Sequence, residues 1–272
     1  MITSTCGKVP VGSTTETTLA TYRLFGISFC VVPKEVVAND IRLRARDNVP
    51  SSVILANAHV IVEAQKDPQL KNAIANASLV IADGMPVTWV LRGKGQRFVE
   101  RYPGSDLMED ILRLESSAAH YLMGSTPDIL GRISGKFKGS VIGSYSPPFT
   151  NNGFTEQEKC RQLELIEKSR PDFIWVGLGA PKQEAYVTEM ASRSSRGVWL
   201  GVGAAFDFHA GIRRRAPQFL QEAGLEWAFR LISEPQRLGP RYLATNPVFI
   251  KLACQELLRR QSNGAVGHDR KA

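Results

Sequence analysis

Short apolar runs alternate with longer amphipathic segments along most of this 272-residue chain. Apolar runs of about four to six residues are typical of buried strands, whereas about 10 to 15 residues with apolar positions at helical spacing predict helices. The apolar runs predict strands at residues 79–82, 120–123, 141–143, 173–176 and 198–202. The segments between these runs predict helices near residues 105–114, 127–136, 155–169 and 181–193.

Ahead of this regular part, residues 22–29 predict a first strand and residues 33–47 a helix. A short apolar strand at residues 53–55 ends near Asn57, and helices follow at residues 59–65 and 68–76. Short buried strands separated by helices are typical of a mostly parallel sheet with helices on both faces. The sequence therefore predicts an α/β, Rossmann-like fold.

The alternation stops after Phe208. Residues 216–260 predict helices, with breaks at Gly224 and at the residues before Pro235, Pro240 and Pro247. The predicted organisation has four parts: a flexible tail at residues 1–20, an α/β core at 21–212, a basic helical appendage at 213–261 and a flexible tail at 262–272.

Composition is that of an ordinary packed protein, with 43% hydrophobic and 22% charged residues. The sequence shows no apolar run near the ~20 residues that span a bilayer, and its first residues are polar, unlike a signal peptide. Four cysteines without a C-x-x-C pair favour reduced, buried thiols over a disulfide framework or a zinc site. These features predict a cytoplasmic protein.

Positive charge is concentrated at the end of the chain. The net charge is +8, and residues 213–272 hold nine arginines and two lysines against four glutamates and one aspartate. Such a block suits nucleic acid, a phosphorylated substrate or an anionic membrane, or is simply a solvated helix surface. Arginine in excess over lysine favours phosphate or carboxylate. Residues 246–260 place an apolar face beside basic residues, to dock on lipid or to pack on the core; that face holds Phe249, Leu252, Ala253 and Leu257.

Candidate chemistry lies at the predicted strand ends, because ligands of open parallel sheets bind at the carboxyl edge. Asp83 directly follows the run LVIA, where it suits a general base or, alternatively, the cap of the next helix. After the run FIWV, the glycines and the proline at a helix start suit phosphate, with Gly179, Lys182 and Gln183 as ligand contacts or as an ordinary helix start.

Two further loops carry candidate residues. Residues 201–211 are rich in small residues and include Asp207 and His209, which can line a pocket. Arg101 precedes a predicted helix and is free to bind an anion, while Ser105 or Asp106 can cap that helix.

Several familiar chemistries are absent from the sequence. Neither glycine loop completes G-x-G-x-x-G, which disfavours a Rossmann oxidoreductase, and no nucleic-acid-binding motif accompanies the basic block. The phosphate loop G-x-x-x-x-G-K-[ST], the nucleophile elbow G-x-S-x-G and the zinc motif H-E-x-x-H are missing, as is any Asp-x-Asp. Without that acidic pair, no metal site is predicted, and arginines are expected to neutralise a leaving diphosphate.

Six segments in this order resemble the WecG/TagA/CpsF glycosyltransferases (glycosyltransferase family 26), over about residues 22–250. They are ADGMP (82–86), ERYPGSDLM (100–108), RPDFIWVGLGAPKQE (170–184), GVGAAFDFHAG (201–211), RRAP (214–217) and GLEWAFRLISEPQRL (224–238). The resemblance implies inverting, metal-independent transfer of a sugar, such as glucose or N-acetylmannosamine, from a UDP-sugar to a polyprenyl-diphosphate-linked saccharide in cell-surface polysaccharide biosynthesis. It also implies a peripheral place on the inner face of the cell membrane, no cofactor and no nucleic-acid partner, and it allows a homo-oligomer.

The same resemblance implies roles for individual residues. Asp83 matches the base that deprotonates the acceptor hydroxyl, and Asn57 matches an asparagine near the acceptor. Arg101 and Gln183 match pocket residues for the donor and the reacting groups. The appendage residues that match arginines closing over the site onto the diphosphate are Arg230, Arg237 and Arg241. The family has a threonine two residues before the asparagine where this chain has Leu55, which suggests a different acceptor. The alternative is a non-catalytic nucleotide-sugar or lipid-diphosphate binding protein on the same fold.

Overall fold

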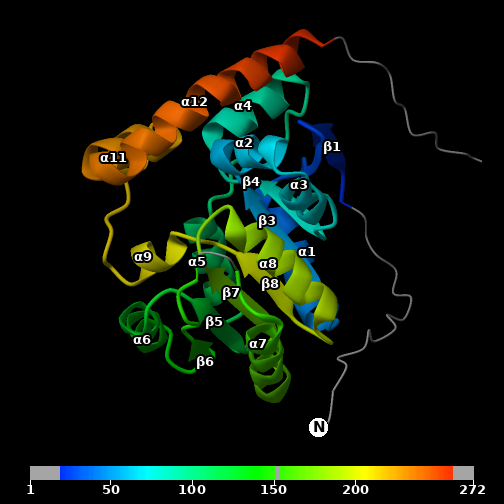
Figure 1. Cartoon of the computed structure of the whole chain (residues 1–272), viewed down its shortest axis with the longest axis vertical. Coiled ribbons are helices and arrows are strands. Elements are labelled where there is room, and N and C mark those ends of the chain that lie inside the picture. The colour runs from blue at the N-terminus through cyan, green and yellow to red at the C-terminus, as the bar shows by residue number, and fades with distance from the viewer. Residues whose placement is uncertain (1–18, 151–152, 260–272) are drawn as a thin grey trace, which may run out of the picture.

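The structure is a computed structural model that describes residues 19–150 and 153–259 (Figure 1). The predicted flexible tails at residues 1–20 and 262–272 lie outside the described residues, apart from residues 19 and 20. Six parallel strands form the central sheet in the order β4-β3-β8-β7-β5-β6. The strands are β3 (Ser51–Ala56), β4 (Leu79–Ala82), β5 (His120–Gly124), β6 (Val141–Tyr145), β7 (Phe173–Gly177) and β8 (Val198–Gly201). The predicted α/β, Rossmann-like fold is confirmed.

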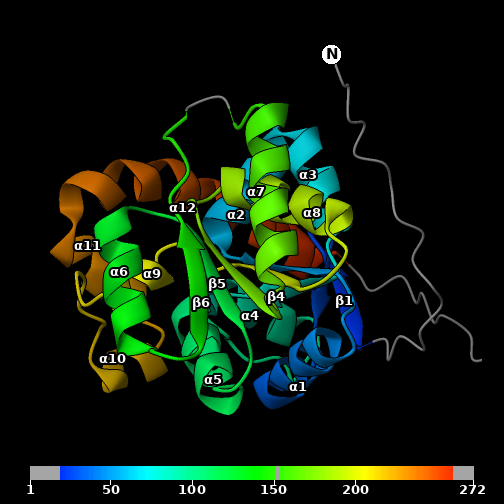
Figure 2. The ribbon, with the colours of Figure 1, turned by 90° about the horizontal axis from the view of Figure 1, so that it is seen from below.

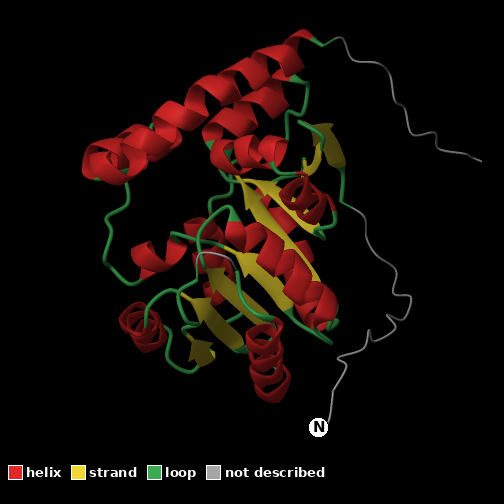
Figure 3. Ribbon diagram, viewed as in Figure 1, coloured by secondary structure: helices red, strands yellow, loops and turns green. Residues whose placement is uncertain are grey.

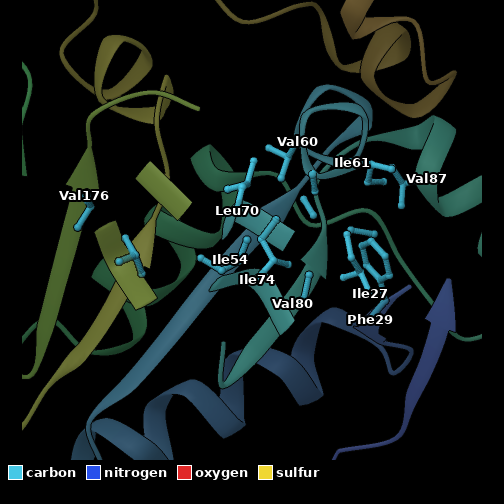
Figure 4. Close-up of a cluster of buried hydrophobic side chains, with 14 of the residues drawn as sticks. Ile27, Phe29, Ile54, Val60, Ile61, Leu70, Ile74, Val80, Val87 and Val176 are labelled. Atoms are coloured by element: carbon cyan, nitrogen blue, oxygen red, sulfur yellow. The ribbon is translucent and has the colours of Figure 1, made fainter. Parts of the chain in front are cut away.

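Helices cover both faces of the sheet (Figure 3). One face carries α1 (Lys34–Arg46), α5 (Gly104–Leu114), α6 (Pro127–Lys136) and the short α9 (Ala205–His209). The other carries α2 (Ala58–Lys66), α3 (Pro68–Ala75), α7 (Glu156–Ser169) and α8 (Lys182–Arg193), with α4 (Met85–Gly93) adjoining. Successive strand residues alternate between two buried apolar clusters, as Val53 and Ile54 do. Figure 4 shows part of the cluster on the face that carries α2, α3, α7 and α8, which includes Ile54, Val80 and Val176.

The prediction of a single first strand at residues 22–29 is wrong. The segment is an antiparallel hairpin of β1 (Thr21–Leu24) and β2 (Ile27–Cys30). Phe25 and Gly26 turn the chain with φ angles of 55° and 79°, and positive φ at both central residues is the geometry of a tight hairpin turn. The segment was predicted as one strand because both strands of the hairpin carry buried apolar side chains, which makes the apolar run continuous in sequence.

The chain after α9 forms α10 (Gln218–Glu222), α11 (Glu226–Ser233) and α12 (Pro235–Leu258). The predicted breaks at Gly224 and before Pro235 are confirmed, but those before Pro240 and Pro247 are wrong, since α12 runs through both prolines. The two prolines are seven residues apart, lie on one face of the helix and are exposed. Water can therefore satisfy the carbonyl groups that each proline leaves without a partner.

α12 lies along α2 and α4 (Figures 1 and 2). Phe249 and Ala253 are buried in the core, and the Phe249 ring centroid lies 5.7 Å from that of Phe25. The apolar face predicted at residues 246–260 therefore packs mainly on the core rather than on lipid. In the described part of the chain, no helix is both long and apolar enough to cross a bilayer.

Three cysteines lie within the described residues, and all three are free. Only Cys30 is buried, while Cys160 is half-buried and Cys254 is exposed on α12. The prediction that the thiols are buried is therefore wrong for these two residues, because helix α7 and the outer side of α12 place them toward solvent.

Candidate active site

β3 and β4 end side by side, and each is followed by a polar residue. Their parallel register pairs Ala56 with Ala82, so Asn57 and Asp83 leave the carboxyl edge of the sheet at neighbouring positions. Asn57 Nδ2 donates a 3.0 Å hydrogen bond to Asp83 Oδ2. The structure thus brings together two residues that the sequence places in the site, at the edge where ligands of such sheets bind.

Asn57 is also the N-cap of α2. Its Oδ1 accepts hydrogen bonds from the backbone N–H groups of His59 at 3.1 Å and Val60 at 3.2 Å. Because the amide oxygen is used in this way, the amide nitrogen is the end that faces Asp83. The first turn of α2 therefore fixes the orientation of the Asn57 side chain.

Asp83 does not cap the helix that follows it. α4 begins at Met85 after Gly84 and has no side-chain cap. Burial raises the pKa of the Asp83 carboxyl above its ordinary value, although the Asn57 hydrogen bond and the Arg230 and Arg101 guanidinium groups oppose this shift. A carboxylate with a raised pKa at a strand end is suited to accept a proton.

Arg101 lies beside Asp83 because Tyr102 N–H donates a 3.0 Å hydrogen bond to Ala82 O. Arg101 Nη1 in turn donates to Glu226 Oε2 at 2.8 Å. These two side chains are 14% and 12% exposed, so the ion pair is largely removed from solvent. Arg101 is thus held between Asp83 and the first residue of α11.

The three candidate arginines of the C-terminal helices have different surroundings. The Arg230 guanidinium carbon lies 5.6 Å from the centroid of the Phe208 ring. The positive charge of Arg230 opposes the rise in the Asp83 pKa that burial causes. Arg241 acts on Glu184 instead, where its positive charge opposes the rise in pKa that burial causes. In the described structure, Nε of Arg230 and of Arg241 is buried without a hydrogen-bond partner. Arg237 is more exposed and donates to Glu234 at 2.5 Å.

Gln183 is a buried connection between two loops. Its Oε1 accepts hydrogen bonds from Gly203 N–H at 3.0 Å and Leu178 N–H at 3.3 Å. Gly201 lies so close that an added Cβ would be 2.9 Å from Gln183 Nε2. The side chain therefore fixes the loops after β7 and β8 relative to each other, which is a positioning task.

The remaining candidate residues are Gly179, Lys182, Asp207 and His209, and the contacts described for them are with residues other than Asn57 and Asp83. Gly179 has a φ of +82° and open space at its Cβ position, while the exposed Lys182 donates to Thr150 O at 3.3 Å. Asp207 pairs with Arg213 at 2.9 Å, and the buried His209 contacts Ser105 O through Nε2 at 3.0 Å. Asp207 and His209 thus connect α9 to neighbouring segments.

Three further residues near the site were missed by the sequence reasoning. Glu184 is buried with no hydrogen-bond partner for Oε2 among the described residues, and burial raises its pKa to about 7. His59 Nδ1 lies 3.3 Å from Thr245 Oγ1 on α12, and burial lowers the pKa of His59 to about 4. The third is Glu226. Glu184 ends the segment RPDFIWVGLGAPKQE, and Glu226 lies near the start of GLEWAFRLISEPQRL. Their positions within these family-like segments were the sequence feature that could have identified them.

The described residues contain no cluster of three or more His, Cys, Asp or Glu side chains that could hold a metal ion. The cationic groups next to Asp83 are instead the guanidinium groups of Arg101 and Arg230.

A family model described as the glycosyl transferase WecG/TagA/CpsF family matches residues 22–263. The match spans the sheet, the Asn57–Asp83 pair and the helices that carry Glu226, Arg230 and Arg241. With nearly the whole chain covered, the protein belongs to the WecG/TagA/CpsF family of glycosyltransferases.

Proposed function

We propose that the enzyme transfers a sugar from a UDP-sugar to a hydroxyl group of a polyprenyl-diphosphate-linked saccharide, with inversion at the anomeric carbon. The observation that carries the proposal is the Asn57–Asp83 pair at the carboxyl edge of the sheet, with guanidinium groups beside it. The sugar is of the glucose or N-acetylmannosamine type, and the product extends a cell-surface polysaccharide.

In this proposal Asp83 is the general base. It removes the proton from the acceptor hydroxyl as the oxygen attacks the anomeric carbon from the face opposite the departing UDP. The Asn57 amide holds the carboxylate in place through the 3.0 Å hydrogen bond. Inversion follows because a single displacement reverses the configuration of the anomeric carbon.

The departing diphosphate requires positive charge, which we assign to arginines. Arg230 and Arg241 each bury an Nε atom that has no partner among the described residues. Fixed guanidinium groups can stabilise charge that develops on phosphate oxygens, so we propose that transfer needs no divalent metal and no cofactor. Arg237 is the outermost of the three and reaches the nucleotide only after leaving Glu234.

We propose that α11 and α12 dock the enzyme on the anionic inner face of the cell membrane. The outer side of these helices exposes Ile232 by 81%, Leu243 by 80% and Ile250 by 60%. Lys251 on α12 and Arg259 at its C-cap are exposed basic residues, and each basic residue near an anionic surface contributes about 1 kcal/mol to binding. A lipid-linked acceptor would then meet the site from the membrane.

A panel of UDP-sugars tests the proposed reaction. The purified protein is assayed with UDP-glucose and UDP-N-acetylmannosamine on a polyprenyl-diphosphate-linked acceptor, with and without a chelator. We expect one donor to be used, an inverted linkage in the product, and the same rate with the chelator. Binding of UDP-sugars without any transfer would favour the non-catalytic alternative, and loss of transfer on chelation would contradict the assigned role of the arginines.

A further inference from the structure

An ion pair between the core and α11 lies next to the proposed base. Arg101 Nη1 donates to Glu226 Oε2 at 2.8 Å, although the two residues are 125 positions apart. The backbone at Tyr102 is hydrogen-bonded to Ala82 O, which places Arg101 against the segment that carries Asp83. Glu226 itself is close enough to raise the pKa of Asp83. The three side chains therefore form one electrostatic group.

Glu226 is held from its other side as well. Its Oε1 lies 3.9 Å from Arg215 Nε. Arg215 donates to Asp106 in the first turn of α5 and to Gln221 at 2.6 Å. The Glu226 carboxylate therefore stands between two guanidinium groups, and the second of these is tied to the core. These two contacts fix the position of the Glu226 carboxylate.

Asp83 faces charged groups from several elements. They are Arg101 before α5, Glu226 and Arg230 on α11, and Glu184 on α8. Arginine beside a carboxylate readily forms a two-hydrogen-bond pair, and that pair makes the carboxylate a weaker base. In this structure Arg101 is hydrogen-bonded to Glu226, and the side chain that donates to Asp83 is the neutral Asn57.

We propose that Glu226 is a positioning residue that holds the Arg101 guanidinium away from Asp83, which leaves the Asp83 carboxylate free to receive the acceptor proton. The inference rests on the proposed function, in which Asp83 is the base. It adds a condition to that function. Because Glu226 is the first residue of α11, the base is free only while α11 is docked on the core.

The test compares the full-length protein with Glu226→Gln and with the double variant Glu226→Gln/Arg101→Gln. The carboxyl carbon of Asp83 is titrated by NMR in protein labelled with ¹³C-aspartate, with Asp83→Asn used for assignment. Transfer is measured against pH on the same samples. Glu222→Gln is the matched control, because Glu222 is an exposed glutamate on neighbouring α10 whose carboxylate accepts a 2.8 Å hydrogen bond from Gln218.

In Glu226→Gln we expect the freed Arg101 to pair with Asp83. The pKa of Asp83 then falls, the acid limb of the kcat profile moves to lower pH, and kcat falls about tenfold or more, within the range that a general base supplies. In the double variant the Asp83 titration returns toward that of the wild type, and the protein avoids an unpaired buried charge. Glu222→Gln matches the wild type throughout.

An Asp83 titration and an acid limb that stay unchanged in a folded Glu226→Gln protein would overturn the proposal, even if activity dropped. Loss of the Glu226 charge by itself also lowers the pKa of Asp83, so the position of Arg101 in a crystal structure of Glu226→Gln separates the two causes. Arg101 hydrogen-bonded to Asp83 supports the proposal, and Arg101 left where the wild type has it contradicts the proposal. If Glu226→Gln does not fold, the double variant carries the test: an Asp83 pKa well below that of the wild type would contradict the account. Absence of transfer by the wild type would refute the proposed function instead, and the NMR titration reads the Arg101–Asp83 relationship independently of it.

Discussion

Asn57 donates a 3.0 Å hydrogen bond to Asp83 while its amide oxygen caps α2. One side chain therefore starts a helix and orients the proposed base at the end of the neighbouring strand. Because β3 and β4 pair in parallel register at Ala56 and Ala82, this relationship is built into the edge of the sheet.

Asn57→Ala should lower stability and alter the titration of the base. Loss of the helix cap costs roughly 0.5–2 kcal/mol of unfolding free energy. Loss of the hydrogen bond removes an influence that lowers the pKa of Asp83, so the acid limb of the kcat profile should move to higher pH. Asp67→Ala is the control, since Asp67 caps α3 in the same way. A shift of the limb in Asp67→Ala, or none in Asn57→Ala, would contradict this reading.

Glu184 should make stability depend on pH. Burial raises the pKa of Glu184 to about 7 in the folded protein, from an ordinary value of 4.5, so its contribution to stability is fully present below pH 4.5 and is lost as the pH rises through 7. The loss is on the order of 3 kcal/mol by linkage. Urea unfolding at pH 5 and pH 8 measures it, and the Glu184→Gln protein should show a smaller difference between the two.

The exposed Glu164 on α7 provides the control for that experiment. Glu164→Gln should keep the pH dependence of the wild type. Equal pH dependence in the wild type and in Glu184→Gln would show that Glu184 ionises as freely in the folded state as in the unfolded one.

The outer side of α12 should control binding to lipid. Leu243→Ser/Ile250→Ser removes two side chains that are 80% and 60% exposed, and it should lower binding to vesicles containing anionic lipid several-fold while leaving the melting temperature nearly unchanged. Leu114→Ser/Ile142→Ser changes similar residues on the core, 56% and 47% exposed. Sedimentation with vesicles compares the two. Equal binding by both double variants would place the lipid contact elsewhere.

Local patterns predict the parallel sheet and the strand ends, because a short apolar run followed by a polar residue is a feature of neighbouring positions. Asp83 was found in this way, whereas the site role of Asn57 was predicted from the family resemblance. The Arg101–Glu226 pair joins residues 125 positions apart, so its formation depends on how α11 meets the core. The course of α12 was misjudged for a related reason: whether a proline ends a helix depends on whether solvent reaches the carbonyl group it leaves free.

The hairpin at the start of the fold shows a second limit. Phe25 and Gly26 both adopt positive φ, yet the apolar residues on either side continue without a polar turn. Hydrophobic pattern alone therefore cannot separate one strand from two. Glycine at the second turn position was the signal available, and its significance depended on the core into which Ile27 and Phe29 pack.

Asp83→Asn tests the central claim most directly. The substitution keeps the size of the side chain and removes its ability to accept a proton, so sugar transfer should fall by at least a hundredfold. UDP binding, measured by calorimetry on the same preparation, should stay within a few-fold of the wild type because the arginines remain. Transfer by Asp83→Asn at the wild-type rate would show that this carboxylate is not the base.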